Sequence, residues 1–215
     1  TNLKFISSVI SEQLVATPTL ITLIAAVSKR WICNPYDLIR SAVPARVASV
    51  DKSFVTETND SSAKTSLKKP EGETTYLQLS PHEDPLKRLS EFAVKARING
   101  SVLIVVPEDR ELELLKVELP DALVLTSSLS RTDRYQNYLT AMNSCNKVII
   151  GTRSAIFLTP PDLATLIVYR ENSQSHYEPR HPGWNVRDIA LLRSQVERVN
   201  LVFGGYSPSV EIARL

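Results

Sequence analysis

Two apolar segments of the sequence, Val148–Ile150 and Leu166–Val168, each run directly into polar residues. Gly-Thr-Arg-Ser follows the first segment, and Tyr-Arg-Glu-Asn follows the second. In open parallel sheets, the loops after the carboxyl ends of the strands carry the chemistry. Carboxylates after the second segment would hold Mg²⁺ and activate a water molecule for phosphoryl transfer. Glu171 is the one carboxylate at that position, and a single carboxylate cannot do both.

The elements that would position these residues alternate between strands and helices from residue 73 to residue 215. Apolar runs predict the strands, and amphipathic runs with helical spacing predict the helices between them. The strands are expected at residues 74–79, 101–107, 122–127, 147–152, 164–169 and 200–205, and the helices at residues 84–100, 109–119, 130–144 and 186–198. Near-continuous apolar strands joined by amphipathic helices predict an α/β fold, with a parallel sheet that is covered on both faces.

The first 72 residues have a different pattern. Residues 17–32 and 34–44 predict two helices, because each segment begins with a capping residue that is followed by proline. Short helices with a tight turn fit a small winged-helix-like unit over residues 1–50, and they also fit a helical cap on the following domain. Residues 51–72 are rich in Ser, Thr and Lys and have no periodicity, so we expect a flexible linker there.

Composition sets only broad limits on function. The 215 residues are 43% hydrophobic and 22% charged, as in an ordinary globular protein, and the net charge of +2 neither requires nor excludes nucleic acid. Cys33 and Cys145 lie far apart, so neither a disulfide framework nor a zinc knuckle is expected. No membrane span and no signal peptide are expected, which predicts a cytoplasmic protein. Because the sequence begins without Met, we expect a fragment of a longer protein.

Six short motifs occur in an order that is similar to that of a known family. They are VVPE (105–108), LTSSLS (125–130), VIIGTRSAIF (148–157), LIVYREN (166–172), RDIALLR (187–193) and GGYSPSVE (204–211). Together they resemble the first motor lobe of the PriA family of replication-restart proteins, relatives of superfamily-two DNA helicases. Residues 20–44 resemble the family's winged-helix region. The resemblance implies a RecA-like lobe of the P-loop NTPase fold over residues 73–215, preceded by a winged-helix-like DNA-binding region.

The loop that would bind phosphate departs from the family pattern. A working motor has a Gly-rich loop ending in Gly-Lys-Thr, whose backbone N–H groups and lysine hold the β- and γ-phosphates. Here the first strand leads into Ser80-Pro81-His82-Glu83-Asp84-Pro85. The two prolines remove N–H donors, and the acids place negative charge where the phosphates would lie. We therefore expect no ordinary nucleotide site at Ser80 and Glu83.

The metal-binding and coupling motifs also depart from the family. The family's Asp-Glu-x-His element is replaced by Tyr169, Arg170, Glu171 and Asn172. A protonated phenol is a poor Mg²⁺ ligand, and Arg170 brings positive charge to the position that activates water. The family's Gly-Ser-Ala-Thr-Pro-Ser motif is replaced by GGYSPS at residues 204–209. This combination resembles the actinobacterial branch of the family, in which the helicase motifs are degenerate, and it implies that the chain has no catalytic residues.

The resemblance places DNA contacts on other residues. Thr152, Arg153 and Ser154 match a turn that presents N–H groups and a hydroxyl to DNA phosphates in related motors, and such contacts position a protein without reading sequence. The alternative is a plain turn with Arg153 in solvent. Lys29 and Arg30 could contact the backbone of duplex DNA. Alternatively, they could only stabilise the predicted helix at residues 17–32, because positive charges near the carboxyl end of a helix interact favourably with its dipole.

The family implies a DNA-binding component of the replication-restart primosome. It would recognise stalled or branched forks and single-stranded DNA at the nucleoid, and would scaffold reloading of the replication machinery with other primosome and replication proteins, without unwinding DNA. One alternative is an ATP-dependent 3′-to-5′ DNA helicase or translocase with a diverged nucleotide site. The other is a doubly wound small-molecule enzyme with an accessory helical domain.

No cofactor is expected in this chain. The resemblance implies that zinc is held by cysteines downstream of it, and it leaves open whether any binding of ATP and Mg²⁺ persists. His176, Glu178 and His181 supply metal-ligand types within one short loop. Pro179 and Pro182 impose an irregular backbone on that loop, so no metal site is expected.

Overall fold

The computed structural model describes residues 8–11, 13–55 and 70–215, and its centre is a six-stranded sheet. The strands are β1 (Thr74–Gln78), β2 (Ser101–Val105), β3 (Leu123–Leu125), β4 (Val148–Gly151), β5 (Leu163–Tyr169) and β6 (Asn200–Gly205). Their order across the sheet is β1-β6-β5-β2-β4-β3, and every neighbouring pair is parallel. The α/β class, the parallel sheet and all six predicted strands are therefore confirmed.

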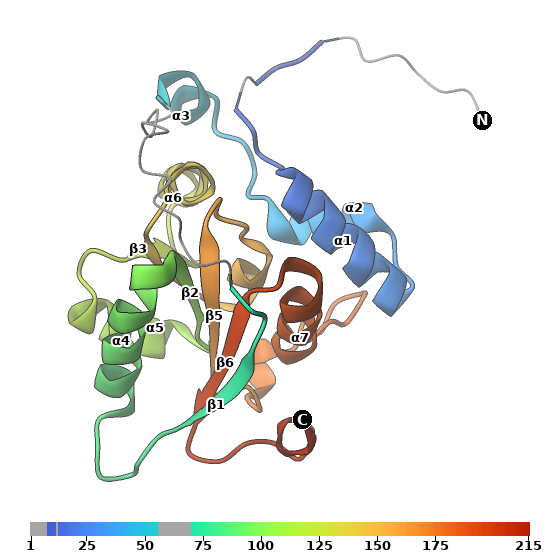
Figure 1. The fold of residues 1–215 in the computed structure, drawn as a ribbon. Helices are drawn as coiled ribbons and strands as arrows, with labels where there is room; N and C mark the ends of the chain where they lie inside the picture. The colour runs from blue at the N-terminus through green and yellow to red at the C-terminus, as the bar shows by residue number, and fades with distance from the viewer. Residues whose placement is uncertain (1–7, 12, 56–69) are drawn as a thin grey trace.

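Helices cover both faces of this sheet (Figure 1). α4 (Pro85–Ala96) and α5 (Asp109–Glu118) lie on one face, and α6 (Arg131–Asn143) and α7 (Val186–Glu197) lie on the other. Side chains of β2 alternate between the two hydrophobic clusters, because successive residues of a strand point to opposite faces. Ile104 packs with α4 and α5, whereas Leu103 packs with α6 and α7. This packing confirms a sheet buried on both sides.

Three helices precede the sheet, namely α1 (Pro18–Trp31), α2 (Pro35–Ala42) and α3 (Ala48–Ser53). The side chains of Thr17 and Asn34 cap α1 and α2, as their sequences predict, by accepting N–H groups of the first turn. Buried residues of all three helices belong to the same cluster as α6 and α7. The helices thus pack on the sheet domain, as a helical cap would, and the assignment of residues 1–50 as a winged-helix-like DNA-binding unit stays a prediction.

The predicted linker begins later than expected, because residues 51–53 are the last turn of α3. The buried carboxylate of Asp51 accepts hydrogen bonds from the hydroxyls of Ser11 (2.8 Å) and Tyr135 (2.6 Å), and it pairs with Arg46 at 2.7 Å. The local sequence around Asp51 is polar and does not predict a buried residue, since the partners of Asp51 lie elsewhere in the chain. Most of the linker prediction, residues 56–69, falls outside the described residues.

Candidate functional site

The loop between β1 and α4 lies where the resemblance to PriA-type motors predicts a phosphate-binding loop. The carboxylate of Asp84 accepts the backbone N–H groups of Leu86 (2.9 Å) and Lys87 (3.3 Å) at the start of α4. Pro85, the first residue of the helix, has no N–H to offer. Phosphate binds at a helix start through N–H groups that have no other partner. Here the carboxylate of Asp84 already accepts two of these N–H groups.

Ser80 has become part of a tight turn in the same loop. Its hydroxyl accepts the N–H of His82 (3.3 Å), and its carbonyl accepts the N–H of Glu83 (3.2 Å). The side chain of Glu83 is exposed to solvent. The loop thus turns back on Ser80, and the carboxylate of Glu83 offers no donor to a phosphate oxygen.

The residues at the end of β5 include a buried phenol and a paired guanidinium group. Tyr169 is buried, and its burial raises the pKa of its phenol, which therefore stays protonated at neutral pH. Arg170 adopts a left-handed backbone conformation (φ 51°) and pairs with Glu111 of α5 at 2.9 Å. The side chain of Asn172 is exposed. The positive charge of Arg170 is thus fixed to α5 at the end of the strand.

Glu171 is buried, with 1% of its surface exposed. One carboxylate oxygen accepts the N–H of Asn172 (3.0 Å), and the other accepts the N–H of Ser209 (2.7 Å). The nearby phenol of Tyr76 has its pKa raised to about 12, first by burial and then by the charge of Glu171. Glu171 therefore ties the loop after β5 to the loop after β6. Both of its oxygens are used in holding backbone.

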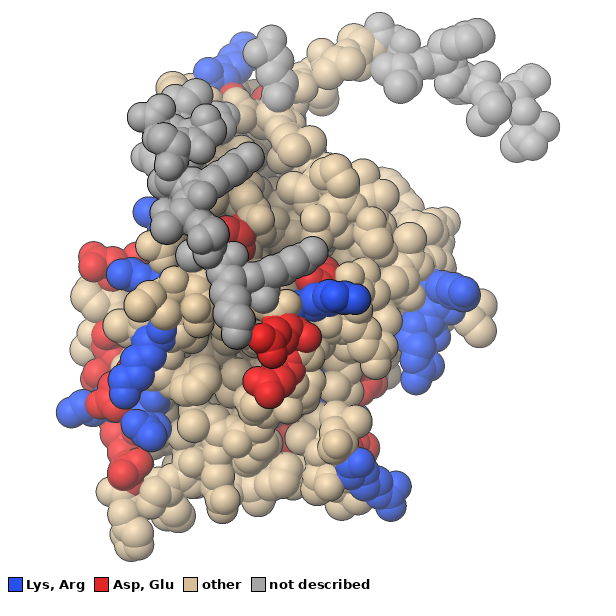
Figure 2. Space-filling model, viewed as in Figure 1, with Lys and Arg blue, Asp and Glu red and all other residues tan. Residues whose placement is uncertain are grey.

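A cleft of about 730 Å³ lies between the start of α4, the length of α5 and the end of β5. We call it the α4–α5 cleft. Its charged lining consists of Asp84, Glu108, Glu111 and Glu118 against Arg110 and Arg170. Figure 2 shows acidic and basic side chains interspersed over this edge of the molecule. The four carboxylates outnumber the two guanidinium groups, so the cleft disfavours a triphosphate.

The Gly-Thr-Arg-Ser turn follows β4 and enters the 3₁₀ helix η3 (Arg153–Phe157). Gly151 is required there, because a Cβ atom would lie 2.7 Å from the carbonyl oxygen of Leu125 on β3. The guanidinium of Arg153 donates to the carbonyl of Tyr177 (2.7 Å) and pairs with Glu178 (3.0 Å). Arg153 is thus held by the loop after β5 and does not lie free in solvent. Its contact with DNA stays a prediction.

Thr152, Arg153 and Ser154 line a second cleft, of about 590 Å³. Three more arginines line it, and we call it the arginine cleft: Arg40 from α2, Arg134 from α6, and Arg180 from the loop after β5. The sequence did not single out these three, because they come from separate elements and share no motif. The fold brings their charges together with the predicted turn.

The acidic residues of the arginine cleft have partners of their own. Glu108 accepts the hydroxyl of Ser175 (3.1 Å), Asp109 accepts that of Thr126, and Glu178 pairs with Arg153. In the part of the chain that the structure describes, Arg40, Arg134 and Arg180 make no ion pair. The buried indole N–H of Trp184, another lining residue, also has no acceptor. The cleft therefore offers donors for a bound anion.

The other candidate residues do not join this cleft. Lys29 and Arg30 lie in the last turn of α1, where the guanidinium of Arg30 lies 5.7 Å from the ring centroid of Trp31. Neither lines the arginine cleft. His176 of the suggested metal loop is buried, with its Nε2 atom 2.9 Å from the carbonyl oxygen of Tyr169, and burial lowers its pKa. Among residues 8–11, 13–55 and 70–215, no three His, Cys, Asp or Glu side chains are placed to hold a metal ion.

Two findings about the chain are negative. Among the described helices, none combines the length and the apolar character needed to cross a lipid bilayer. No protein-family model matches the sequence.

Comparison with known proteins gives relatives along nearly the whole chain. The "Probable replication restart protein PriA" of Mycobacterium leprae is 28% identical over 236 residues, which covers 97% of this chain and 36% of the relative. The "Replication restart protein PriA" of Chlamydia trachomatis is 32% identical over 124 residues, which covers 54% of this chain and 16% of the relative. Among solved structures, the Escherichia coli DExH-box NTPase HrpB matches with a TM-score of 0.45 and 18% identity, over 68% of this chain and 20% of that one.

The mycobacterial match includes the N-terminal helices as well as the sheet domain, since it covers 97% of the chain. The chain spans about a third of the length of that relative, 36%. Over nearly its whole length, the chain is similar to proteins named as replication restart protein PriA.

Proposed function

We propose that this chain is the DNA-binding part of a replication restart protein, and that it holds the DNA backbone in the arginine cleft. The observation that carries the proposal is the convergence of Arg40, Arg134 and Arg180 with the turn at residues 152–154. Guanidinium groups and hydroxyls are the usual contacts to DNA phosphates, and they read no sequence. A cleft of this kind suits a protein that recognises DNA by its shape.

The biological role follows from the relatives, whose names state replication restart. We propose that the DNA is single-stranded or branched, as at a stalled fork. The chain would bind primosome and other replication proteins there, so that the replication machinery is reloaded onto the DNA. The protein would act in the cytoplasm, at the nucleoid. It would act as a scaffold and would not unwind DNA. Asp84 accepts the N–H groups that a motor keeps for phosphate, and Tyr169 and Arg170 replace the carboxylates that it keeps for metal and water.

The test is DNA binding by arginine variants, measured by fluorescence anisotropy with labelled single-stranded and forked DNA over a range of salt. Arg134→Ala and Arg180→Ala should weaken binding to every sequence alike. On single-stranded DNA, each should lower the slope of log K against log salt by about 0.7 for every phosphate that the arginine neutralises in the unaltered chain.

Arg97→Ala is the matched control, because Arg97 is exposed at the opposite end of β2, outside the arginine cleft. If the two cleft variants bind DNA as tightly as the control does, DNA does not bind in the arginine cleft. If the unaltered chain binds no DNA, the proposed function itself fails.

A further inference from the structure

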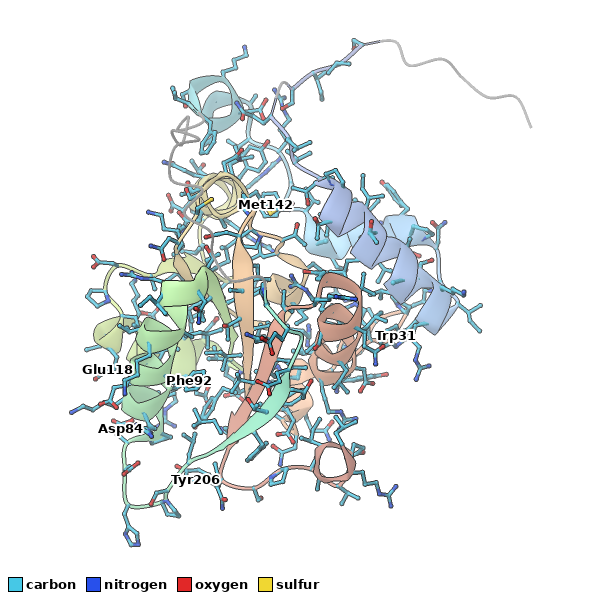
Figure 3. All side chains as sticks on the ribbon, viewed as in Figure 1. Trp31, Asp84, Phe92, Glu118, Met142 and Tyr206 are labelled. Atoms are coloured by element: carbon cyan, nitrogen blue, oxygen red, sulfur yellow. The ribbon has the colours of Figure 1, made fainter. Side chains whose placement is uncertain are left out.

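The α4–α5 cleft has an apolar side as well as an acidic one. Leu114 and Val117 of α5 line it with 52% and 76% of their surfaces exposed. Glu111 and Glu118 each lie one turn from Leu114 on the same side of the helix, since residues three and four apart are neighbours on a helix, and both line the cleft. In Figure 3, Asp84 and Glu118 lie on the same side of the sheet. The cleft therefore combines uncovered apolar side chains with carboxylates.

One carboxylate of the cleft is only half paired among the described residues. Glu111 gives one carboxylate oxygen to Arg170, but its other oxygen, Oε2, is buried without a donor. A buried acceptor without a donor costs stability, and a donor that reached this oxygen would relieve that cost.

Several kinds of ligand do not fit these features. A triphosphate would meet more carboxylates than arginines, and its usual N–H donors are used by Asp84. An anionic membrane surface would be repelled for the same electrostatic reason. A bare metal ion would leave Leu114 and Val117 uncovered. A cation attached to apolar groups satisfies both sides of the cleft.

We propose that the α4–α5 cleft docks a segment of a partner protein in which a lysine or arginine is flanked by apolar side chains. The cation pairs with the carboxylates of Glu111 and Glu118, and the apolar side chains cover Leu114 and Val117. The segment lies along α5, between this helix and the start of α4. This recognition is charge-complementary and is separate from DNA binding, because Arg40, Arg134 and Arg180 do not line this cleft.

The experiment uses the ¹⁵N-labelled 215-residue chain and two blocked peptides, Leu-Arg-Leu-Lys-Leu and Leu-Glu-Leu-Glu-Leu. Amide chemical shifts are followed in each titration. The basic peptide should shift the amides of Glu111, Leu114, Glu118 and Arg170 in a saturable way, and the acidic peptide should not. Glu111→Gln should weaken binding of the basic peptide at least about fivefold, as expected for loss of a charge-assisted hydrogen bond.

Glu113→Gln is the matched control, because Glu113 is exposed on the same helix but does not line the cleft. Glu111→Gln also releases Arg170, so Val117→Lys provides a second variant, which changes an exposed side chain and adds a charge that repels the peptide. Both cleft variants should bind more weakly than the control.

Four results would overturn the proposal. The acidic peptide could bind as tightly as the basic one, or the basic peptide could fail to bind. The cleft variants could bind the basic peptide as tightly as Glu113→Gln does, or the chain could self-associate in a way that Val117→Lys abolishes. The last result would mean that a second copy of the chain occupies the cleft.

Discussion

At the scale of single residues, Glu171 is a buried carboxylate that holds backbone. It lies within the stretch that resembles the family's Asp-Glu-x-His element, and both of its oxygens accept backbone N–H groups, of Asn172 and Ser209. Asp84 behaves in the same way at the start of α4. In both places a negatively charged group satisfies N–H donors, which stabilises the loops.

Glu171→Gln should therefore lower stability. The neutral amide accepts the Ser209 N–H less strongly, and its NH₂ group adds buried donors that need partners, so the free energy of unfolding should fall by about 1–3 kcal/mol. Urea denaturation monitored by circular dichroism measures this change. Glu83→Gln is the control, because Glu83 is exposed, and its effect should stay within about 0.5 kcal/mol. Equal stability of the two variants would mean that Glu171 does not hold the loops.

At the scale of elements, the carboxylate of Asp51 joins α3 to α6 and to the segment before α1. The hydrogen bond from Tyr135 is the largest cause that lowers the pKa of Asp51, and the bonds from Ser11 and Arg46 lower it further. This interaction links α3 to α6, beside the apolar contacts that hold all three N-terminal helices on the sheet domain. We expect it to make the stability of the fold dependent on pH.

The sign of that dependence follows from the lowered pKa. Asp51 stabilises the fold above its unfolded pKa of about 3.9, and this contribution is lost as the pH falls through the lower pKa of the folded state. Between about pH 5 and pH 3, the unaltered chain should lose more stability than Asp51→Asn does. Urea denaturation at several pH values tests this, and equal losses in the two proteins would contradict it.

Most elements could be predicted from the sequence, because their apolar periodicity and capping residues are local. The six strands, and the helices that begin after Thr17, Asn34 and Asp84, are examples. α3 could not be predicted, since its six residues have no helical pattern and its buried Asp51 depends on distant partners.

The candidate site could be predicted only in part. The turn at residues 152–154 has a recognisable motif, whereas Arg40, Arg134 and Arg180 meet only after folding. The ion pair between Arg153 and Glu178 spans two loops and has no local signal either.

At the scale of the whole molecule, two clefts of different character lie at the carboxyl edge of one sheet. The arginine cleft carries guanidinium groups without ion-pair partners among the described residues, and the α4–α5 cleft carries an excess of carboxylates. Glu108 lines both clefts. The net charge of +2 gives no sign that basic and acidic side chains are separated into two clefts. The arrangement suits a scaffold that holds an anionic polymer and a cationic protein segment side by side.

The most direct test of this account is a titration of the ¹⁵N-labelled chain with a non-hydrolysable ATP analogue and Mg²⁺, with and without single-stranded DNA. Asp84 already accepts the N–H groups at the start of α4, and Tyr169 and Arg170 stand where a motor has its two carboxylates. The amides of Glu83, Leu86, Lys87 and Asn172 should therefore show no saturable shift up to about 1 mM, which corresponds to a binding free energy weaker than about −4 kcal/mol. Saturable shifts at those four amides at micromolar concentrations would contradict the claim that the nucleotide site is lost.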